Sequence, residues 1–412
     1  MEKITAQAAA QKWEISLRRV QDYCKKGKIP GAERFGSNWM IPADASKPAD
    51  GRCKRGAGES QPRKMLLRQS PFLDMTDLYR EPGSADRRIA ELAPYPETQT
   101  QFAAAIAYSR GQIDRVYSQA QQMLEDHTDV YTMVSGGVLM SLVAVWKGDV
   151  ALWYEARRHL TEIPCQTEAD HDVVALSVAA VDVAVRHTDA FPTWFMKGRF
   201  DTLPKDAHPA ARVYYVKHLI VAAQEVAMGN SKMAGVEGLG FLRLLPYIVE
   251  PMISQMVAEK VILAEIYLRL FCGIAYRQSG DDQAAAEHVD RAVMLCLADG
   301  LYGPLVEHRR QLGAFLDDRI ALVDPEALKK VKEMHKQLLR GWTTVHNAVM
   351  QKTVSAQLSP REREVARLVA FGFSDAQIAA RLFLSESSVK ALVRSAKNKT
   401  GVEKRRELID FV

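Results

Sequence analysis

Two cations near the C-terminus have the type and the spacing needed to contact nucleic-acid bases. Lys390 and Arg394 are four residues apart, so one helical turn places both side chains on the same face. Arg and Lys make the commonest specific contacts with guanine, and Ala391 between them can contact a thymine methyl group. Four neighbouring residues are better placed to contact phosphates. Such contacts fix the position of the protein on the nucleic acid without specifying its sequence. The four residues are Ser387, Ser388, Arg381 and Lys397.

A helix from Glu386 to about Thr400 has to position these side chains. Apolar or small residues recur there at steps of three and four, as on the buried face of an amphipathic helix. They are Val389, Leu392, Val393, Ala396 and Thr400. The opposite face then presents the cations to solvent.

Capping residues predict two further helices directly before this one. Ser359 precedes proline and Glu362, and Ser374 precedes Gln377, so each serine is followed three residues later by a side chain that completes a capping box. Ser385 is expected to cap the third helix. Short helices joined by such tight turns, the last one basic on one side, favour a helix-turn-helix.

Residues 358–412 resemble the LuxR-type, also called GerE-type, DNA-binding domain. The matching text is LSPRE at 358–362, GFS at 372–374, IA at 378–379, LFLS at 382–385 and VK at 389–390. The resemblance implies that the helix from Glu386 is the recognition helix. It also implies double-stranded DNA and RNA polymerase as partners, and a homodimer formed through a final helix from about Lys404.

The sequence departs from this family pattern at four positions. Gln377 replaces the usual glutamate, Leu392 a frequent histidine, Ala396 a larger aliphatic residue and Thr400 a leucine. The first change can remove an ion pair within the domain, and the last two thin its core. None of them removes the basic face.

The N-terminal residues predict a second small helical module. Thr5 and Ser16 are expected to cap two short helices, and Leu17, Val20 and Cys24 form the inward stripe of the second. Residues 35–42, FGSNWMIP, follow a glycine stop and are typical of a small hairpin or wing that ends in proline.

This segment resembles the winged-helix DNA-binding domain of the MerR and excisionase group. In such domains the second helix enters the major groove and the wing contacts the neighbouring backbone. The resemblance nominates Arg18, Arg19 and Lys25 on the helix and Arg34 near the wing. The alternative is a module of the same fold that binds protein.

Between these modules the sequence is helix-compatible and weakly repetitive. Polar or glycine turns recur between helical stretches near residues 111, 148, 188, 230 and 280. Units of this size cannot bury their apolar faces alone and must stack, which predicts an α-solenoid. The pattern resembles degenerate tetratricopeptide repeats; an irregular all-α bundle is the alternative.

No motif in this middle region points to catalysis, a cofactor or a metal. It contains no GxxxxGK[ST] loop and no HExxH, and the glycines of GVEGLG at 235–240 follow no strand. The five cysteines form no CxxC pair, and the histidines are scattered. The sequence therefore favours a protein that is not an enzyme and binds neither metal nor cofactor.

Charge divides the 412-residue chain into basic ends and an acidic middle. Residues 1–70 carry 15 Lys and Arg against 7 Asp and Glu, residues 352–412 carry 12 against 7, and the remainder carries 28 against 36. This partition is expected if both ends meet phosphate and the middle does not. With no signal-peptide core and no uncharged run long enough for a bilayer, we expect a cytoplasmic protein.

Together these patterns predict an all-α protein apart from a small wing. Its expected parts are a winged helix-turn-helix at 1–45, a basic flexible linker at 46–84, a helical-repeat domain at 85–340, a connector at 341–357 and the LuxR-type domain at 358–412. The expected function is a sequence-specific transcriptional regulator whose repeat domain senses a protein, peptide or other ligand. The alternative is an interaction scaffold whose terminal modules bind protein.

Overall fold

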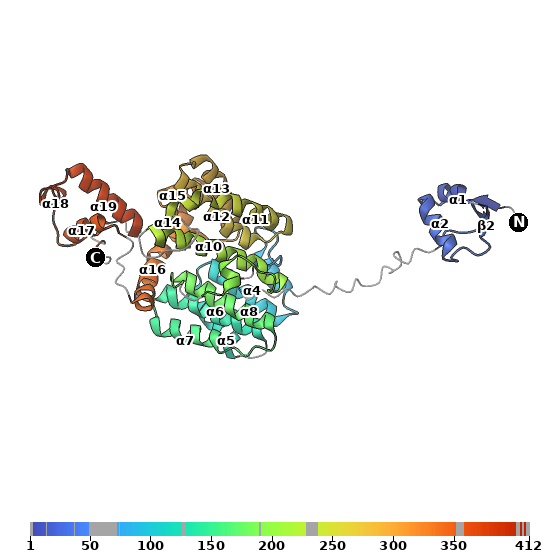
Figure 1. The fold of residues 1–412 in the computed structure, drawn as a ribbon, viewed down its shortest axis with the longest axis horizontal. Coiled ribbons are helices and arrows are strands. Elements are labelled where there is room, and N and C mark those ends of the chain that lie inside the picture. The colour runs from blue at the N-terminus through green and yellow to red at the C-terminus, as the bar shows by residue number, and fades with distance from the viewer. Residues whose placement is uncertain are drawn as a thin grey trace. The chain divides into compact units, whose positions relative to one another are not determined.

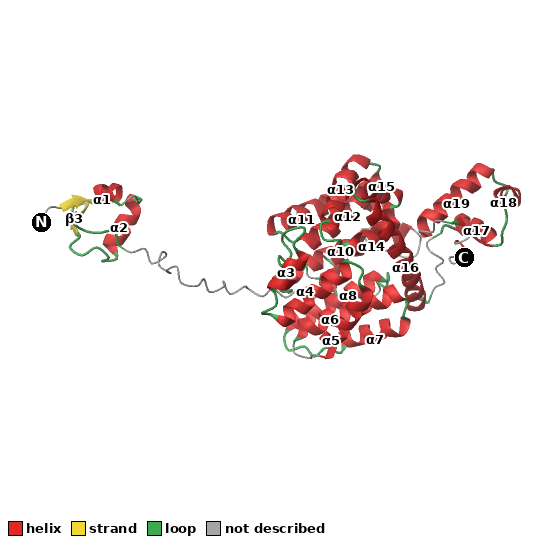
Figure 2. Ribbon diagram, turned by 180° about the vertical axis from the view of Figure 1, so that it is seen from behind, coloured by secondary structure: helices red, strands yellow, loops and turns green. Residues whose placement is uncertain are grey.

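The computed structural model describes residues 3–48 except 14 and 37, residues 72–351 except 74, 126–128, 189–190 and 228–237, residues 358–400, and residues 404, 405 and 408. The chain divides into two units, Met1–Leu66 and Leu67–Val412. Helices dominate the described residues, and strands occur in the first unit (Figures 1 and 2). The predicted fold class is therefore confirmed at the level of a mostly helical protein.

The first unit combines two helices with a three-stranded antiparallel sheet. Its elements are β1 (Lys3–Thr5), α1 (Ala6–Lys12), α2 (Leu17–Lys25), β2 (Glu33–Phe35) and β3 (Asn38–Pro42). The strand order is β1-β3-β2, so the predicted hairpin is present and β1, which the sequence did not reveal, extends it. Thr5 caps α1 as predicted, because its Oγ1 accepts a hydrogen bond from the Ala8 amide at 3.2 Å.

The prediction that Leu17 belongs to the inward-facing stripe of α2 is wrong. Leu17 is 38% exposed, whereas Val20 and Cys24 are buried and Tyr23 joins them. Leu17 is the first residue of the helix, and its side chain points towards the N-terminal end, beyond the turn that packs on the core. Ser16 occupies the cap position, but its hydroxyl makes no capping hydrogen bond.

The second unit begins with a helical body that ends in the long helix α16. Its α-helices are α3 (Ala85–Glu91), α4 (Pro96–Ser109), α5 (Ile113–Glu125), α6 (Val130–Lys147), α7 (Val150–Thr161), α8 (Glu168–Ala184), α9 (Thr193–Met196), α10 (His208–Ala227), α11 (Leu245–Glu259), α12 (Ile262–Ser279), α13 (Asp282–Leu297), α14 (Tyr302–Leu312), α15 (Ala314–Val323) and α16 (Pro325–Met350).

Three of the predicted turns separate packed helix pairs. Gly111, Gly148 and Gly280 each have a positive φ and follow α4, α6 and α12. The turn near residue 187 is followed by the single-turn helix α9, and residues 228–237, which include the turn predicted near 230, lie outside the described residues. The tetratricopeptide-like repeat stays a prediction.

Close backbone approach fixes α16 against α6. A Cβ atom on Gly341 would lie 2.3 Å from the Val145 carbonyl oxygen, so only glycine allows this contact. Because α16 runs from Pro325 to Met350, the helical body continues past residue 340, where the sequence placed a boundary.

Residues before Ala85 also belong to the helical body. Phe72 and Met75 are buried, and the Tyr79 hydroxyl donates a hydrogen bond to Asp299 at 2.6 Å. The predicted linker, 46–84, thus ends earlier than residue 84, since this segment contacts Tyr214 of α10 and Asp299 in the turn after α13. Residues 49–71 of that linker lie outside the described residues.

The expectation that no run in the sequence is long and apolar enough for a bilayer is wrong for helix α6. Val130–Lys147 is long and apolar enough to cross a membrane by length and composition. However, 78% of this window is buried inside the helical body, as in the core helix of a globular protein. The cytoplasmic location stays a prediction.

Candidate nucleic-acid interface

Three short helices form the C-terminal domain, and serines cap each of them. They are α17 (Pro360–Ala370), α18 (Asp375–Leu382) and α19 (Glu386–Thr400). Ser359 Oγ accepts from the Glu362 amide at 3.1 Å while the Glu362 carboxylate accepts from the Ser359 amide at 2.7 Å. Ser385 Oγ accepts from the Ser388 amide at 3.1 Å. The predicted helix starts are therefore confirmed.

The capping box of α18 forms although Gln377 replaces the glutamate that is usual in the family. The Gln377 side-chain oxygen accepts from the Ser374 amide at 2.9 Å, and Ser374 Oγ accepts from the Gln377 amide at 3.3 Å. An amide oxygen serves the capping box as a carboxylate does.

Core packing turns the cationic face of α19 outwards. Val389, Val393, Ala396 and Thr400 are buried, while Leu392 is half-buried. They pack with buried residues of α17 and α18, among them Val365, Val369 and Ile378. The predicted inward stripe is thus confirmed.

The side chains nominated for base contacts lie on the opposite face. Lys390, Ala391 and Arg394 are exposed, and Lys397 is half-buried. Within the residues that the structure describes, none of these three cations forms an ion pair. Their charges therefore stay available for an external anion, and Lys390 and Arg394 stand one turn apart.

The nominated phosphate contacts gather around the beginning of α19. Ser387 and Ser388 are exposed, and each hydroxyl lies 2.8 Å from Ser385 Oγ. Free amides and the helix dipole make such a terminus favourable for a phosphate group. Arg381, exposed at the end of α18, lies with its guanidinium 5.4 Å from the Phe373 ring centroid.

Sequence reasoning missed the buried tie that holds α19 against α17. Glu362 is 4% exposed and accepts hydrogen bonds from Lys399 Nζ and Ser395 Oγ, both at 2.6 Å. Burial opposes ionisation, but the hydrogen bonds from Lys399, Ser395 and Ser359 outweigh it and lower the pKa of Glu362. The capping box predicted a role for Glu362, but no local sequence pattern predicts its contacts with residues more than thirty positions away.

A second missed contact anchors the segment after α19. Arg405 pairs with Asp375 and donates to the Phe373 carbonyl at 2.8 Å, while Leu408 is buried. The dimer contact expected from the final helix involves Leu408, Ile409 and Val412. Leu408 packs into the core of the domain, and the other two lie outside the described residues.

The N-terminal candidates all lie on the surface of the first unit. Arg18, Arg19 and Lys25 are exposed on α2, and Arg34 is exposed on β2. Phe35 beside it is 83% exposed, next to the turn between β2 and β3. The unit therefore gathers three nominated cations on one helix and places the fourth on the hairpin.

One group of potential metal ligands escaped the sequence patterns. Glu250, Cys272 and His288, from α11, α12 and α13, bring their ligand atoms within 4.8 Å of one another. The Tyr276 hydroxyl already donates to Glu250, and burial raises the pKa of the Cys272 thiol to about 12. The Cys272 thiol is therefore protonated, and the Glu250 carboxylate is already engaged by Tyr276.

Comparison with known proteins addresses the C-terminal domain alone. No curated protein and no solved structure matches the chain. Residues 356–412 match the model for the family described as bacterial regulatory proteins, luxR family. The chain therefore carries a LuxR-family helix-turn-helix domain at its C-terminus, which supports a DNA-binding transcriptional regulator at the level of the family.

Proposed function

We propose that the chain regulates transcription by reading a specific DNA sequence with α19. The observation that carries this proposal is the exposed face of Lys390 and Arg394 in a domain that matches a regulatory family. Two free cations one turn apart can each reach the edge of a base in the major groove. Ala391 between them fits against a thymine methyl group.

Phosphate contacts complete this proposed interface. Ser387, Ser388 and the amides at the beginning of α19 bind one phosphate, and Lys397 and Arg381 bind flanking ones. These contacts set the register of the helix in the groove and supply affinity that does not depend on sequence.

The first unit provides a second proposed DNA contact. A helix pair followed by an antiparallel hairpin supports a winged-helix arrangement, with Arg18, Arg19 and Lys25 in a groove and Arg34 on the DNA backbone. A homodimer and an encounter with RNA polymerase belong to the same proposal. In it, the acidic helical body does not contact DNA and instead controls the C-terminal domain in response to a bound partner or ligand.

Selection from a random pool of DNA duplexes tests the proposal. The purified full chain should enrich one sequence, and its affinity for that duplex should fall steeply with added salt, because each phosphate contact releases a counterion. Enrichment of no sequence, with no measurable affinity for duplex, would instead favour the interaction scaffold.

Deletion of residues 1–45 tests the N-terminal contact separately. The shortened chain should keep the half of the enriched sequence that α19 reads and lose flanking preference or affinity. An unchanged sequence and unchanged affinity would remove the first unit from DNA binding.

A further inference from the structure

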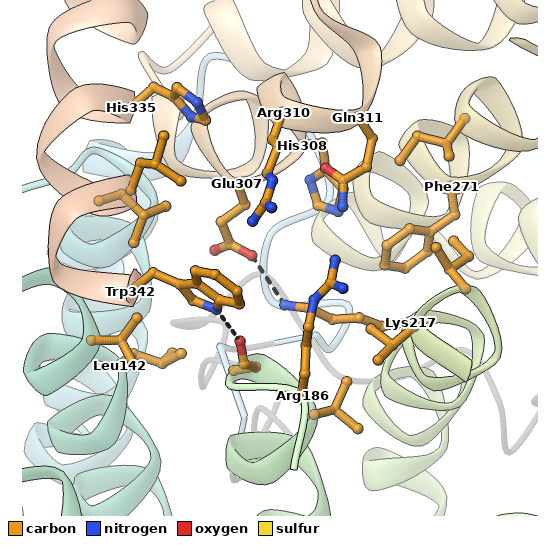
Figure 3. Close-up of a pocket in the computed structure, with 18 of the residues that line it drawn as sticks. Leu142, Arg186, Lys217, Phe271, Glu307, His308, Arg310, Gln311, His335 and Trp342 are labelled. Carbon is orange, nitrogen blue, oxygen red and sulfur yellow. Dashed lines mark hydrogen bonds and ion pairs between the residues drawn. The ribbon is translucent and has the colours of Figure 1, made fainter. Parts of the chain in front are cut away.

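A cavity of about 120 Å³ lies within the helical body (Figure 3). Side chains from α4, α6, α8, α10, α12, α14 and α16, and from the turn after α8, line it. This volume is several times that needed for one water molecule, so the cavity can hold a small molecule.

Positive charge exceeds negative charge among the described residues that line this cavity. Arg186, Lys217 and Arg310 face a single carboxylate, Glu307. Glu307 is already occupied, because Lys217 Nζ lies 3.4 Å from it (Figure 3). The hydroxyls of Tyr108 and Tyr267 also donate to it, at 2.9 and 3.2 Å. Glu307 therefore supplies no carboxylate to Arg310, another cation of the wall.

Arg310 has no counter-charge among the described residues. Its buried Nη2 atom has no hydrogen-bond partner, and no ion pair with it occurs among the described residues. Burial and the nearby Arg186 lower the pKa of Arg310 to about 9. Its guanidinium points into the cavity and lies 5.1 Å from the Trp342 ring centroid (Figure 3). A buried guanidinium without a counter-charge is costly, so it calls for an anion from outside.

Arg186 stands at a left-handed turn position that holds glycine in three comparable turns of the helical body and lysine, Lys260, in another. It has a φ of 62°, and the His187 amide bonds back to the Asp182 carbonyl at 2.9 Å, closing the helix in a left-handed turn. Gly111, Gly148 and Gly280 occupy the same place in three comparable turns. Glycine adopts this conformation at lower cost. The arginine therefore accepts strain and places a cation in the cavity, where it donates to Gln224 at 2.8 Å.

The remaining wall suits an organic molecule with its own hydrogen-bond donor. Phe271 and Trp342 provide aromatic surface. Burial lowers the pKa of both His308 and His335 to about 4, so both rings are neutral. Nδ1 of His335 donates to the Val306 carbonyl at 2.9 Å, which leaves its buried, unpartnered Nε2 as an acceptor.

We propose that this cavity binds a small organic anion, with its carboxylate or phosphate between Arg186 and Arg310 and its body against Trp342 and Phe271. Such a ligand joins the end of α8 to α14 and α16. Helix α16 is the last helix before the C-terminal domain, so the ligand also acts as the signal that controls DNA binding. This last step rests on the proposed function, whereas binding itself does not.

Thermal unfolding of the full chain tests the site with simple probes. Benzoate and phenyl phosphate are the aromatic carboxylate and phosphate, inorganic phosphate lacks the aromatic body, and benzamide is the neutral counterpart of benzoate. At constant ionic strength, benzoate or phenyl phosphate should raise Tm by several degrees, inorganic phosphate by less, and benzamide not at all. If neither aromatic anion raises Tm more than benzamide does, the site is overturned.

Substitution of the arginines separates a binding role from a structural one. Arg310→Met removes the uncompensated charge at similar length, so it should raise the Tm of the ligand-free chain and abolish the response to the anions. Arg186→Gly, which fits the left-handed turn, should also lose the response. Arg115→Gln, a change at an exposed arginine of α5, should keep it. A lower Tm in Arg310→Met with the response retained would contradict the proposal.

Affinity for the selected duplex, measured with and without the aromatic anion, tests the regulatory step. A several-fold change in the wild-type chain and none in Arg310→Met supports it. A rise in Tm without any change in DNA affinity overturns the regulatory step and leaves the binding site standing. DNA binding without any response of Tm overturns the site and leaves the proposed function intact.

Discussion

The cations of α19 and those of the cavity are the same residue types in opposite environments. Lys390 and Arg394 lie on a solvent-facing helix surface, whereas Arg310 is desolvated and its pKa is lowered. On α19 the buried residues occupy one face of the helix, so cations on the opposite face remain hydrated and lose no solvation energy. In the cavity the same charge opposes burial, and only a partner of opposite charge stabilises it.

This difference separates two kinds of recognition. Exposed cations suit a long polyanion, where many contacts add and dissolved salt competes with each. Buried cations suit a small anion of matching shape, because solvent is excluded and salt screens little. Under the two proposals, one chain combines an interface for DNA with a site for a small charged molecule.

Acid should unfold the helical body well before the C-terminal domain. The folded pKa of His308 and His335 is about 4, below the ordinary 6.5, so the folded state binds fewer protons. Their contribution to the free energy of unfolding is complete above pH 6.5 and is lost as the pH falls towards 4. Each histidine contributes about 1.4 kcal/mol for every unit by which its folded pKa lies below its unfolded pKa. Urea unfolding followed by tryptophan fluorescence should show several kcal/mol less stability at pH 5 than at pH 7.5.

The C-terminal domain provides the contrast in this experiment. It contains no histidine and no tryptophan, and the lowered pKa of Glu362 removes stability only below about pH 4.5. His308→Gln should flatten the pH dependence, whereas His159→Gln, at a half-exposed site on α7, should not. Equal stability at pH 7.5 and pH 5 would show that the buried histidines titrate as in water.

Arg394→Ala should weaken binding to the selected duplex by about 1–3 kcal/mol and relax the preference at one position. Arg361→Ala is the matched control, since Arg361 is exposed on α17 but already pairs with Glu364 at 3.0 Å. Fluorescence anisotropy with labelled duplexes measures both. Equal losses in the two variants would mean that α19 contributes charge without reading bases.

Lys397→Gln should have the smallest effect. A phosphate contact carries no sequence information, so affinity should fall by a similar factor for every duplex. The slope of log affinity against log salt should decrease by about 1. A change in the preferred sequence would instead place Lys397 among the base contacts.

The C-terminal domain could be predicted because its signals are local. Ser359 and Ser374 stand three residues from their capping partners, and the stripe from Val389 to Thr400 follows one helical period. Each of these patterns lies within a few turns of helix. The exposed face of Lys390 and Arg394 follows from that stripe alone.

The cavity could not be predicted because its residues meet only after folding. Arg186, Arg310 and Trp342 come from a turn and two helices that are far apart in sequence. One local signal was present: Arg186 occupies a turn position that holds glycine after α4, α6 and α12. Its significance depends on knowing what the side chain meets. The stacking of the helix pairs as regular repeats has no such local signature and stays a prediction.

The central claim is that α19 reads DNA sequence, and repeated selection from the random duplex pool tests it most directly. The wild-type chain and the Lys390→Ala/Arg394→Ala variant, shown to be folded by circular dichroism, should be compared under identical salt. We expect one enriched sequence for the wild type and loss or alteration of that sequence for the variant. The same enriched sequence from both proteins would contradict the assignment of base contacts to α19.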